Sequence, residues 1–303
     1  MIRIDKLTRG RWGNKILHYN YLMQLSKIYN RKPSCGGWDT DNQYYWNGRE
    51  FFKEICEDKS LIKPVKKLTW QEFLENNLKL DDNFDYLLDN SFLFNNVFFK
   101  LTKIDPREFL QLKDVYKPNL NKDFIRVGIH IRGGDIRGAD GNGGREIHPP
   151  EYYIESIKLI EEEFKDKKIK YHVCTDDKSF DTYLITTNYL IDNDLDFEEG
   201  FDSIKNKTIQ DSDKDFIYDF GLLTECDILI NSSSTFCICA GFLGKKNKKI
   251  IHSKEWLDRN LNHTLWHANG DPEYIRKMQL NIDQFWIDLY NGGNEYYKLW
   301  KIV

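Results

Sequence analysis

The chain has 303 residues, of which 40% are hydrophobic and 15% aromatic, and its formal net charge at pH 7 is −4. This is enough apolar material for one large domain or two of ordinary size. The slightly negative charge argues against nucleic acid or an anionic membrane surface as a partner. Residues 1–6 lack the apolar core of a signal peptide, and no run of about 18 apolar residues could span a bilayer. We therefore expect a cytoplasmic protein with no stable membrane insertion.

The six cysteines do not form the CxxC pairs that are typical of zinc sites. In the absence of an export signal we expect reduced thiols, and Cys237 and Cys239, two apart in an apolar stretch, are interpreted as small buried side chains. Acidic repeats at 192–194, 211–213 and 213–215 match the D-x-D pattern of some metal sites. None of them directly follows an apolar strand, so a solvated loop is the preferred interpretation. We expect neither a metal nor another cofactor.

At the amino terminus, the alternation in residues 2–4 predicts a short strand, and a helix is expected over residues 14–29. Between them lie Gly10 and Gly13. A strand, a glycine loop and a helix in this order direct the first N–H groups of the helix at an anion. Asn14 is placed where its amide could point into a crevice. A tight turn without any ligand is the alternative interpretation.

Residues 31–120 have less regular patterns. An aromatic section at 38–52 is interpreted as ordinary core, and a sugar-binding surface is the alternative. Helical periodicity after a capping box predicts a helix over 69–80, and the apolar stretch 90–101 can hold a strand. The proline and asparagines of 116–121 interrupt both periodicities and predict a linker.

From residue 121 on, apolar strands alternate with amphipathic helices. Strands are expected at 126–131, 169–175, 226–231 and 249–252, and helices from His148 on and over 215–225, 236–243 and 272–292. Residues 192–215 are acidic and are expected to form a loop. The alternation predicts a parallel sheet with helices on both faces. With the amino-terminal strand and helix, it predicts an α/β protein of two domains, 1–120 and 121–303, that face each other across a cleft.

Polar clusters follow three of the expected strands, and the carboxyl ends of parallel strands share one edge of a sheet. The clusters are His130, Arg132 and Asp135; Thr175, Asp176 and Asp177; and Ser232, Ser233, Ser234 and Thr235. Arg132 is a planar cation in front of two glycines and is suited to phosphate oxygens. The hydroxyl run opens a helix, so it either cradles a phosphate or only caps that helix. His130 is either a structural imidazole or a residue of the site.

Asp219 lies in the helix expected at 215–225. Its carboxylate could accept hydrogen bonds from N1–H and N2–H of a guanine, which form a pair of donors. From the residues alone, a solvated acid on the outside of the helix is the preferred interpretation.

Taken together, these segments resemble the GDP-fucose-dependent fucosyltransferase superfamily, which includes α1,2-, α1,6- and protein O-fucosyltransferases. Residues 10–14 resemble its GxxGNQ signature, and residues 130–135 resemble its HxRxxD motif. Residues 174–177 are similar to the third signature, and residues 227–236 to the last. The α1,2-type members of glycosyltransferase family 11 are the most similar. Lys15 stands where the family has a glutamine, and Gly133 where many relatives have a second arginine.

The resemblance implies a GT-B fold of two Rossmann-like domains and a reaction without a metal. It implies that Arg132 binds the β-phosphate of GDP-fucose, that Asp219 reads guanine, and that the serines before the last helix hold phosphate. The donor-binding residues expected on this basis are Gly13, Asn14, His130, Arg132, Thr175, Asp176, Asp219, Ser233, Ser234 and Thr235.

The expected reaction is inverting transfer of L-fucose from GDP-β-L-fucose to a hydroxyl of a glycan acceptor, with an α1,2 linkage. Arg132 would stabilise the charge that develops on the departing GDP. Asp135 is the first candidate for the base that deprotonates the acceptor, and Glu146 and His148 are further candidates. Two alternatives are a transferase of the same fold that uses another nucleotide sugar, and a non-enzymatic glycan-binding module built on the aromatic section.

Overall fold

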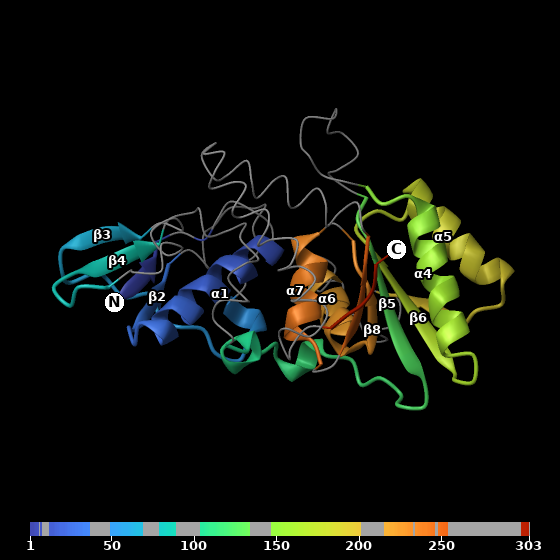
Figure 1. Cartoon of the computed structure of the whole chain (residues 1–303), viewed down its shortest axis with the longest axis horizontal. Coiled ribbons are helices and arrows are strands. Elements are labelled where there is room, and N and C mark those ends of the chain that lie inside the picture. Colours follow the sequence, from blue (N-terminus) through green and yellow to red (C-terminus); the bar gives the residue numbers. More distant parts are fainter. Residues whose placement is uncertain are drawn as a thin grey trace. The chain divides into compact units, whose positions relative to one another are not determined.

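The computed structural model describes residues 1–5, 7, 12–36, 49–68, 79–88, 104–133, 147–200, 215–232, 234–245, 248–253 and 298–302 (Figure 1). The described residues up to Lys113 form one compact unit, and those from Asp114 on form a second. Several expected features lie outside the described residues. These are Gly10, the aromatic residues at 38–46, residues 69–78 of an expected helix, the apolar stretch at 90–101 and the helix expected at 272–292.

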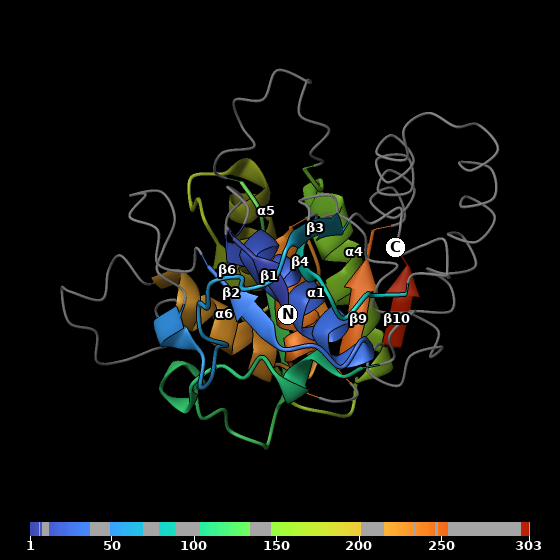
Figure 2. The same cartoon turned by 90° about the vertical axis from the view of Figure 1, so that its left-hand side faces the viewer.

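The first unit contains a parallel sheet in the order β2-β1-β4-β3 and the helix α1 (Figure 2). Its elements are β1 (Ile2–Ile4), α1 (Trp12–Ile28), β2 (Pro33–Cys35), the 3-10 turns η1 (Arg49–Phe51) and η3 (Pro106–Glu108), β3 (Val65–Leu68) and β4 (Asp85–Leu88). The strand and the helix expected at the amino terminus are therefore confirmed, and so is a second sheet. Gly13 lies inside α1, and residues 8–11 lie outside the described residues.

Helix α1 is buried on nearly all sides instead of along one apolar stripe. Besides Leu22 and Leu25, it buries polar residues such as Lys15 and Gln24. The side-chain amide of Gln24 donates to Asn20 Oδ1, one turn earlier, at 3.1 Å. A helix that is covered on all sides needs no amphipathic periodicity, so polar side chains are buried on it beside the apolar ones.

The second unit contains an all-parallel sheet in the order β10-β9-β8-β5-β6-β7. Its elements are the 3-10 turn η4 (Asp114–Tyr116), β5 (Ile125–Ile131), α4 (Pro150–Glu163), β6 (Ile169–Thr175), α5 (Asp181–Asp192), β7 (Phe197–Glu199), α6 (Asp215–Glu225), β8 (Ile228–Ile230), α7 (Thr235–Leu243), β9 (Lys249–His252) and β10 (Lys298–Ile302). The parallel α/β sheet expected for this half of the chain is confirmed.

Three elements of the second unit differ from the sequence-based expectation. Strand β7 lies inside the segment expected to be an acidic loop, and it pairs with β6 through Tyr171 and Phe197. It is an edge strand, and charged side chains are common on edge strands because they face water. Its acidic composition therefore did not indicate a strand. Helix α5 and the edge strand β10 were not expected either.

Counted along the chain within the second unit, the strand order is 3-2-1-4-5-6, which is the doubly wound Rossmann order. Helices α4 and α5 lie on one face of the sheet, and α6 and α7 lie on the other (Figure 1). The chain leaves β5 towards α4 and leaves β8 towards α7. The order of the strands therefore reverses between β5 and β8, which are direct neighbours.

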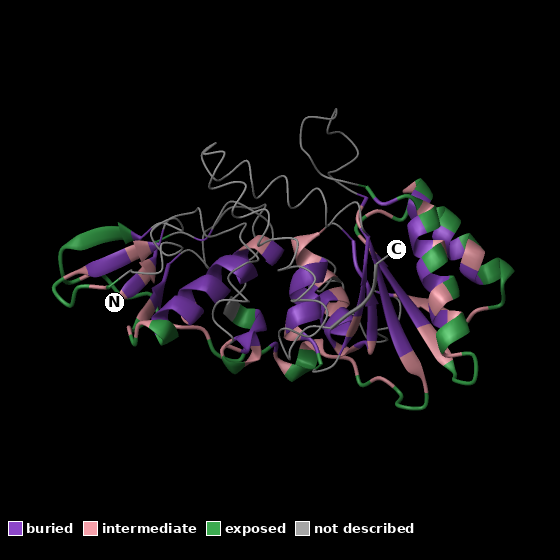
Figure 3. Ribbon diagram, viewed as in Figure 1, coloured by how far each residue is buried: buried purple, intermediate pink, exposed green. Residues whose placement is uncertain are grey.

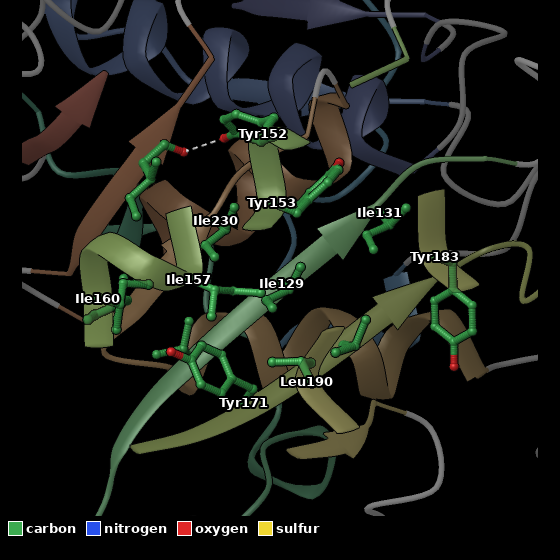
Figure 4. Packing of buried hydrophobic residues seen from close by; sticks show 14 residues of the cluster. Ile129, Ile131, Tyr152, Tyr153, Ile157, Ile160, Tyr171, Tyr183, Leu190 and Ile230 are labelled. Carbon is green, nitrogen blue, oxygen red and sulfur yellow. Dashed lines mark hydrogen bonds between the residues drawn. The ribbon is translucent and has the colours of Figure 1, made fainter. Parts of the chain in front are cut away.

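Strand β5 is buried on both faces, which is why its sequence is almost continuously apolar (Figure 3). On one face, Ile129 belongs to a core that includes Ile157 of α4 and Leu190 of α5 (Figure 4). On the other face, Gly128 lies against α6, where an added Cβ would stand 2.8 Å from Leu223 Cδ2. In the described part of the chain, no helix has the length and apolar character needed to cross a membrane.

Replacing Ile157 by alanine is expected to lower the free energy of unfolding by about 2–5 kcal/mol, because the side chain is fully buried and the cavity collapses only in part. Urea unfolding at pH 7 measures the change. Leu184→Ala on the neighbouring helix α5 is the matched control, since that leucine is 44% exposed. It should shift the free energy by no more than about 0.5 kcal/mol. Equal effects of the two variants would contradict this description of the core.

Candidate functional site

The candidate site is the carboxyl edge of the second sheet, where β5 and β8 end side by side. Ile129 of β5 pairs with Ile230 of β8, and both strands end within two residues of that pair. Because their crossover helices lie on opposite faces, the connections diverge at this point. Open α/β sheets bind ligands at such a reversal of strand order.

A hydrogen bond between His130 and Ser232 joins the ends of β5 and β8. The His130 Nδ1 atom lies 2.6 Å from Ser232 Oγ, both side chains are buried, and the imidazole packs against Phe236 of α7 at 5.3 Å between ring centres. Burial lowers the pKa of His130 to about 4; the Asp176 carboxylate opposes this shift and the Arg132 charge adds to it. His130 is therefore a neutral imidazole at pH 7. Ser232, which belongs to the hydroxyl run but was not among the donor-binding residues expected from the sequence, is its partner.

Two adjacent tyrosines of α4 hold the same strand ends from the other face. The Tyr153 hydroxyl donates to the carbonyl of His130 at 3.2 Å, and the Tyr152 hydroxyl lies 2.8 Å from the carbonyl of Asn231 and 3.1 Å from that of Ile251. One helical turn thus anchors β5, β8 and β9 at their carboxyl ends. No sequence motif pointed to these tyrosines.

Arg132 follows β5 directly and pairs with Asp176, which follows β6. Its Nη1 atom donates to Asp176 Oδ2, and the backbone N–H of Gly133 donates to Asp176 Oδ1 at 2.8 Å. The Arg132 side chain is 13% exposed, at the sheet edge and outside the packed core of β5. Because a carboxylate repels a phosphate, Asp176 is not suited to contact a phosphate itself. Its ion pair with Arg132 instead fixes the orientation of the guanidinium.

Gly133 has a packing reason for being glycine. A Cβ at this position would stand 2.8 Å from Phe180 Cδ1 and 2.9 Å from Cγ of the same ring. A larger side chain, such as the second arginine found in many relatives of the family that the sequence resembles, would displace Phe180. Packing against Phe180 is therefore sufficient to explain the glycine after Arg132 without any ligand.

The other expected contacts near these strand ends have local roles in the structure. Ser234 caps helix α7, because its side chain accepts the N–H of Phe236 at 3.3 Å. Thr235 is the first residue of that helix and is half-buried. The Thr175 hydroxyl accepts the N–H of Asp177 at 3.1 Å in the turn after β6. Contact of any of these three hydroxyls with a ligand stays a prediction.

Asp219 does not have the environment expected of a solvated helix acid, and that interpretation is wrong. Its Oδ1 atom is buried, and the carboxylate and the Cys174 thiol of β6 meet at the same point beside Gly200. It lies in the second turn of α6, on the side of the helix that faces the sheet. The periodicity of the helix could not show this, because its apolar residues, such as Phe220 and Leu223, define the buried side without reference to Asp219.

The remaining expected site residues divide between the two units. Gly13 and Asn14 are the second and third residues of α1 in the first unit, where Gly13 is buried and Asn14 half-buried. His148 precedes α4 and packs against Tyr152 at 4.6 Å between ring centres. Burial lowers its pKa to about 4, which weakens it as a general base at pH 7.

Three expected residues, Asp135, Glu146 and Ser233, lie outside the described part of the chain. Among the described residues, no group of three or more His, Cys, Asp or Glu side chains is arranged to hold a metal ion. Independence of a metal stays a prediction.

No protein-family model and no curated protein sequence matches the chain. Among solved structures, POFUT1 in complex with GDP-fucose is similar over 82% of this chain and 96% of its own length, with 10% sequence identity and a TM-score of 0.48. A mutant of Arabidopsis thaliana FUT1 in complex with GDP is similar over 80% of this chain and 68% of its own, with 12% identity and a TM-score of 0.42. At TM-scores below one half, neither similarity establishes the fold or the function of this chain.

Four buried imidazoles predict a loss of stability at mildly acidic pH. Burial lowers the pKa of His130, His148 and His172 to about 4 and that of His252 to about 3. Between these values and the ordinary pKa, the unfolded chain binds protons that the folded chain does not bind. The free energy of unfolding should therefore fall as the pH drops below the ordinary value, by roughly 1 kcal/mol per imidazole between pH 7.5 and 5.5.

Urea unfolding at pH 7.5, 6.5 and 5.5 measures this dependence in a range where ordinary carboxyl groups stay ionised. His172→Gln should have a flatter profile than the unmodified protein, because it removes one of the titrating groups. A midpoint that stays constant across the range would show that these imidazoles are not neutral and buried.

Proposed function

We propose that the protein is a glycosyltransferase of the GT-B type that transfers L-fucose from GDP-β-L-fucose to a hydroxyl of a glycan, with inversion and an α1,2 linkage. The observation that carries the proposal is the position of Arg132 at the carboxyl edge of β5, beside the reversal of strand order. Residues of two sequence motifs that resemble those of fucosyltransferases also meet there, through His130 and Ser232.

The first unit is proposed to face the second across a cleft, as the acceptor-side domain of residues 1–120 opposite the nucleotide-binding domain of residues 121–303. Support comes from its own parallel sheet and from the helix α1 that follows β1. Gly13 and Asn14 in the first turn of α1 would then contribute to the donor site from the opposite wall.

In the proposed reaction, the bond between the fucose anomeric carbon and the β-phosphate oxygen breaks, and negative charge accumulates on the departing GDP. Arg132 and the N–H groups at the start of α7 stabilise that charge more strongly than they stabilise the bound donor, which lowers the barrier. Asp176 holds the guanidinium in position before the donor arrives, so less reorganisation accompanies the reaction. The acceptor oxygen forms the new bond to the anomeric carbon from the face opposite the departing GDP, and its proton goes to Asp135, Glu146, His148 or the phosphate.

Arg132→Ala should lower turnover of GDP-fucose about a hundredfold or more, the scale on which a lost donor to a developing anion reduces the rate. Arg132→Lys should retain part of the activity, because it keeps the charge and loses the planar fork. Release of GDP in the presence of a glycan acceptor measures turnover.

The matched control is Arg107→Ala in the first unit. Arg107 is 17% exposed and forms an ion pair with Asp105 at 2.8 Å, so its environment is comparable to that of Arg132. Its loss should leave turnover within about twofold of the unmodified protein, on the scale of other substitutions remote from a site. Near-normal turnover in Arg132→Ala would refute the proposed mechanism.

A thermal shift with GDP, UDP and dTDP should show stabilisation by GDP alone. A ligand that binds only the folded state stabilises it by about 2.7 kcal/mol at a hundredfold excess over its Kd. Stabilisation by UDP or dTDP instead of GDP would favour a transferase that uses another nucleotide sugar. No response to any nucleotide would favour a glycan-binding module.

A further inference from the structure

The carboxylate of Asp219 occupies a confined place between α6 and the strands β6 and β7. Gly200, the residue after β7, has no room for a side chain. An added Cβ would stand 2.5 Å from Asp219 Oδ1 and 2.5 Å from Cys174 Sγ. The backbone of Gly200 cannot easily retreat, because its N–H donates to the carbonyl of Val173 at 2.9 Å and extends the pairing of β7 with β6.

The Cys174 thiol is the side chain of β6 that meets this carboxylate. Cys174 is 1% exposed and pairs in register with His130, so both side chains point to the face of the sheet covered by α6 and α7. Burial, together with the charge of Asp219, raises the pKa of the Cys174 thiol well above its ordinary value. The thiol therefore keeps its proton, and its S–H group is a hydrogen-bond donor beside the carboxylate.

A carboxylate held in this way has a fixed orientation. The thiol defines where one hydrogen bond goes, and the absent side chain at Gly200 lets the carboxylate lie against the strand backbone. Guanine offers two parallel donors, N1–H and N2–H, and hypoxanthine offers only N1–H. A carboxylate of fixed orientation discriminates between these two bases. Hypoxanthine lacks the second donor, so its binding would leave one acceptor position of the partly desolvated Asp219 carboxylate without a hydrogen bond.

We propose that Cys174 and Gly200 are positioning residues that fix the Asp219 carboxylate for the 2-amino group of guanine and so determine the base selectivity of the site. This inference rests on the proposed function, because it requires that a guanine nucleotide binds to the second unit. Cys174 and Gly200 themselves act through Asp219 and need not contact the base.

The test compares the Kd values of GDP and IDP, which differ only in the 2-amino group, by calorimetry on the full chain. The unmodified protein should prefer GDP by roughly tenfold or more, the value of one hydrogen bond to a charged group. Cys174→Ala removes the donor and Gly200→Ala displaces the carboxylate, so both should bring the ratio close to one. Cys174→Ser keeps a donor in the same place and should preserve the preference.

Cys239→Ala is the matched control. Cys239 is also a fully buried cysteine, but it lies on α7, and its loss should leave the ratio unchanged. A preference for GDP that persists in both Cys174→Ala and Gly200→Ala would overturn the inference and leave the proposed function intact. Parallel weakening of GDP and IDP, with the ratio kept, would also overturn it, since it would indicate a purely structural role. An unmodified protein that binds neither nucleotide would instead refute the proposed function.

Discussion

The hydrogen bond between His130 and Ser232 is the contact on which the carboxyl edge of the second sheet depends. It joins β5 and β8 at the point where their connections leave towards opposite faces of the sheet. Because the imidazole is buried and neutral, the bond needs no counter-charge inside the protein. Tyr152 and Tyr153 fix the same strand ends from the opposite face. Helix α7 therefore begins at a defined place relative to Arg132.

Charged groups follow one another along this edge in an order that suits an extended ligand. The start of α7 and Arg132 lie at the centre of the sheet, where they favour an anion. Asp176 follows on the next strand and orients Arg132. Further out, Asp219 lies against β6 and β7, where a carboxylate favours donors of a neutral base. The proposed donor, a sugar nucleoside diphosphate, has an anionic part and a base rich in hydrogen-bond donors in the same succession.

Buried polar groups also connect the candidate site to the stability of the second unit. His130 and His148 flank the strand ends, and the burial of both side chains disfavours their charged forms. Gly133 and Gly200 each lie where a Cβ would collide with a neighbouring side chain, Phe180 in one case and Asp219 in the other. The residues that shape the edge are thus held by the same contacts that stabilise the fold.

The sequence by itself determined the four inner strands of the second sheet, β5, β6, β8 and β9, because largely apolar runs such as residues 126–131 are typical of strands that are covered on both faces. It did not determine the edge strands β7 and β10. It also determined that His130, Arg132 and the hydroxyl run share one edge. Only the tertiary structure decided the partners: Ser232 for His130, Asp176 for Arg132 and Cys174 for Asp219. Local periodicity records which side chains are covered. It contains no information on strand order, and strand order brings together residues that lie up to 102 positions apart in the chain.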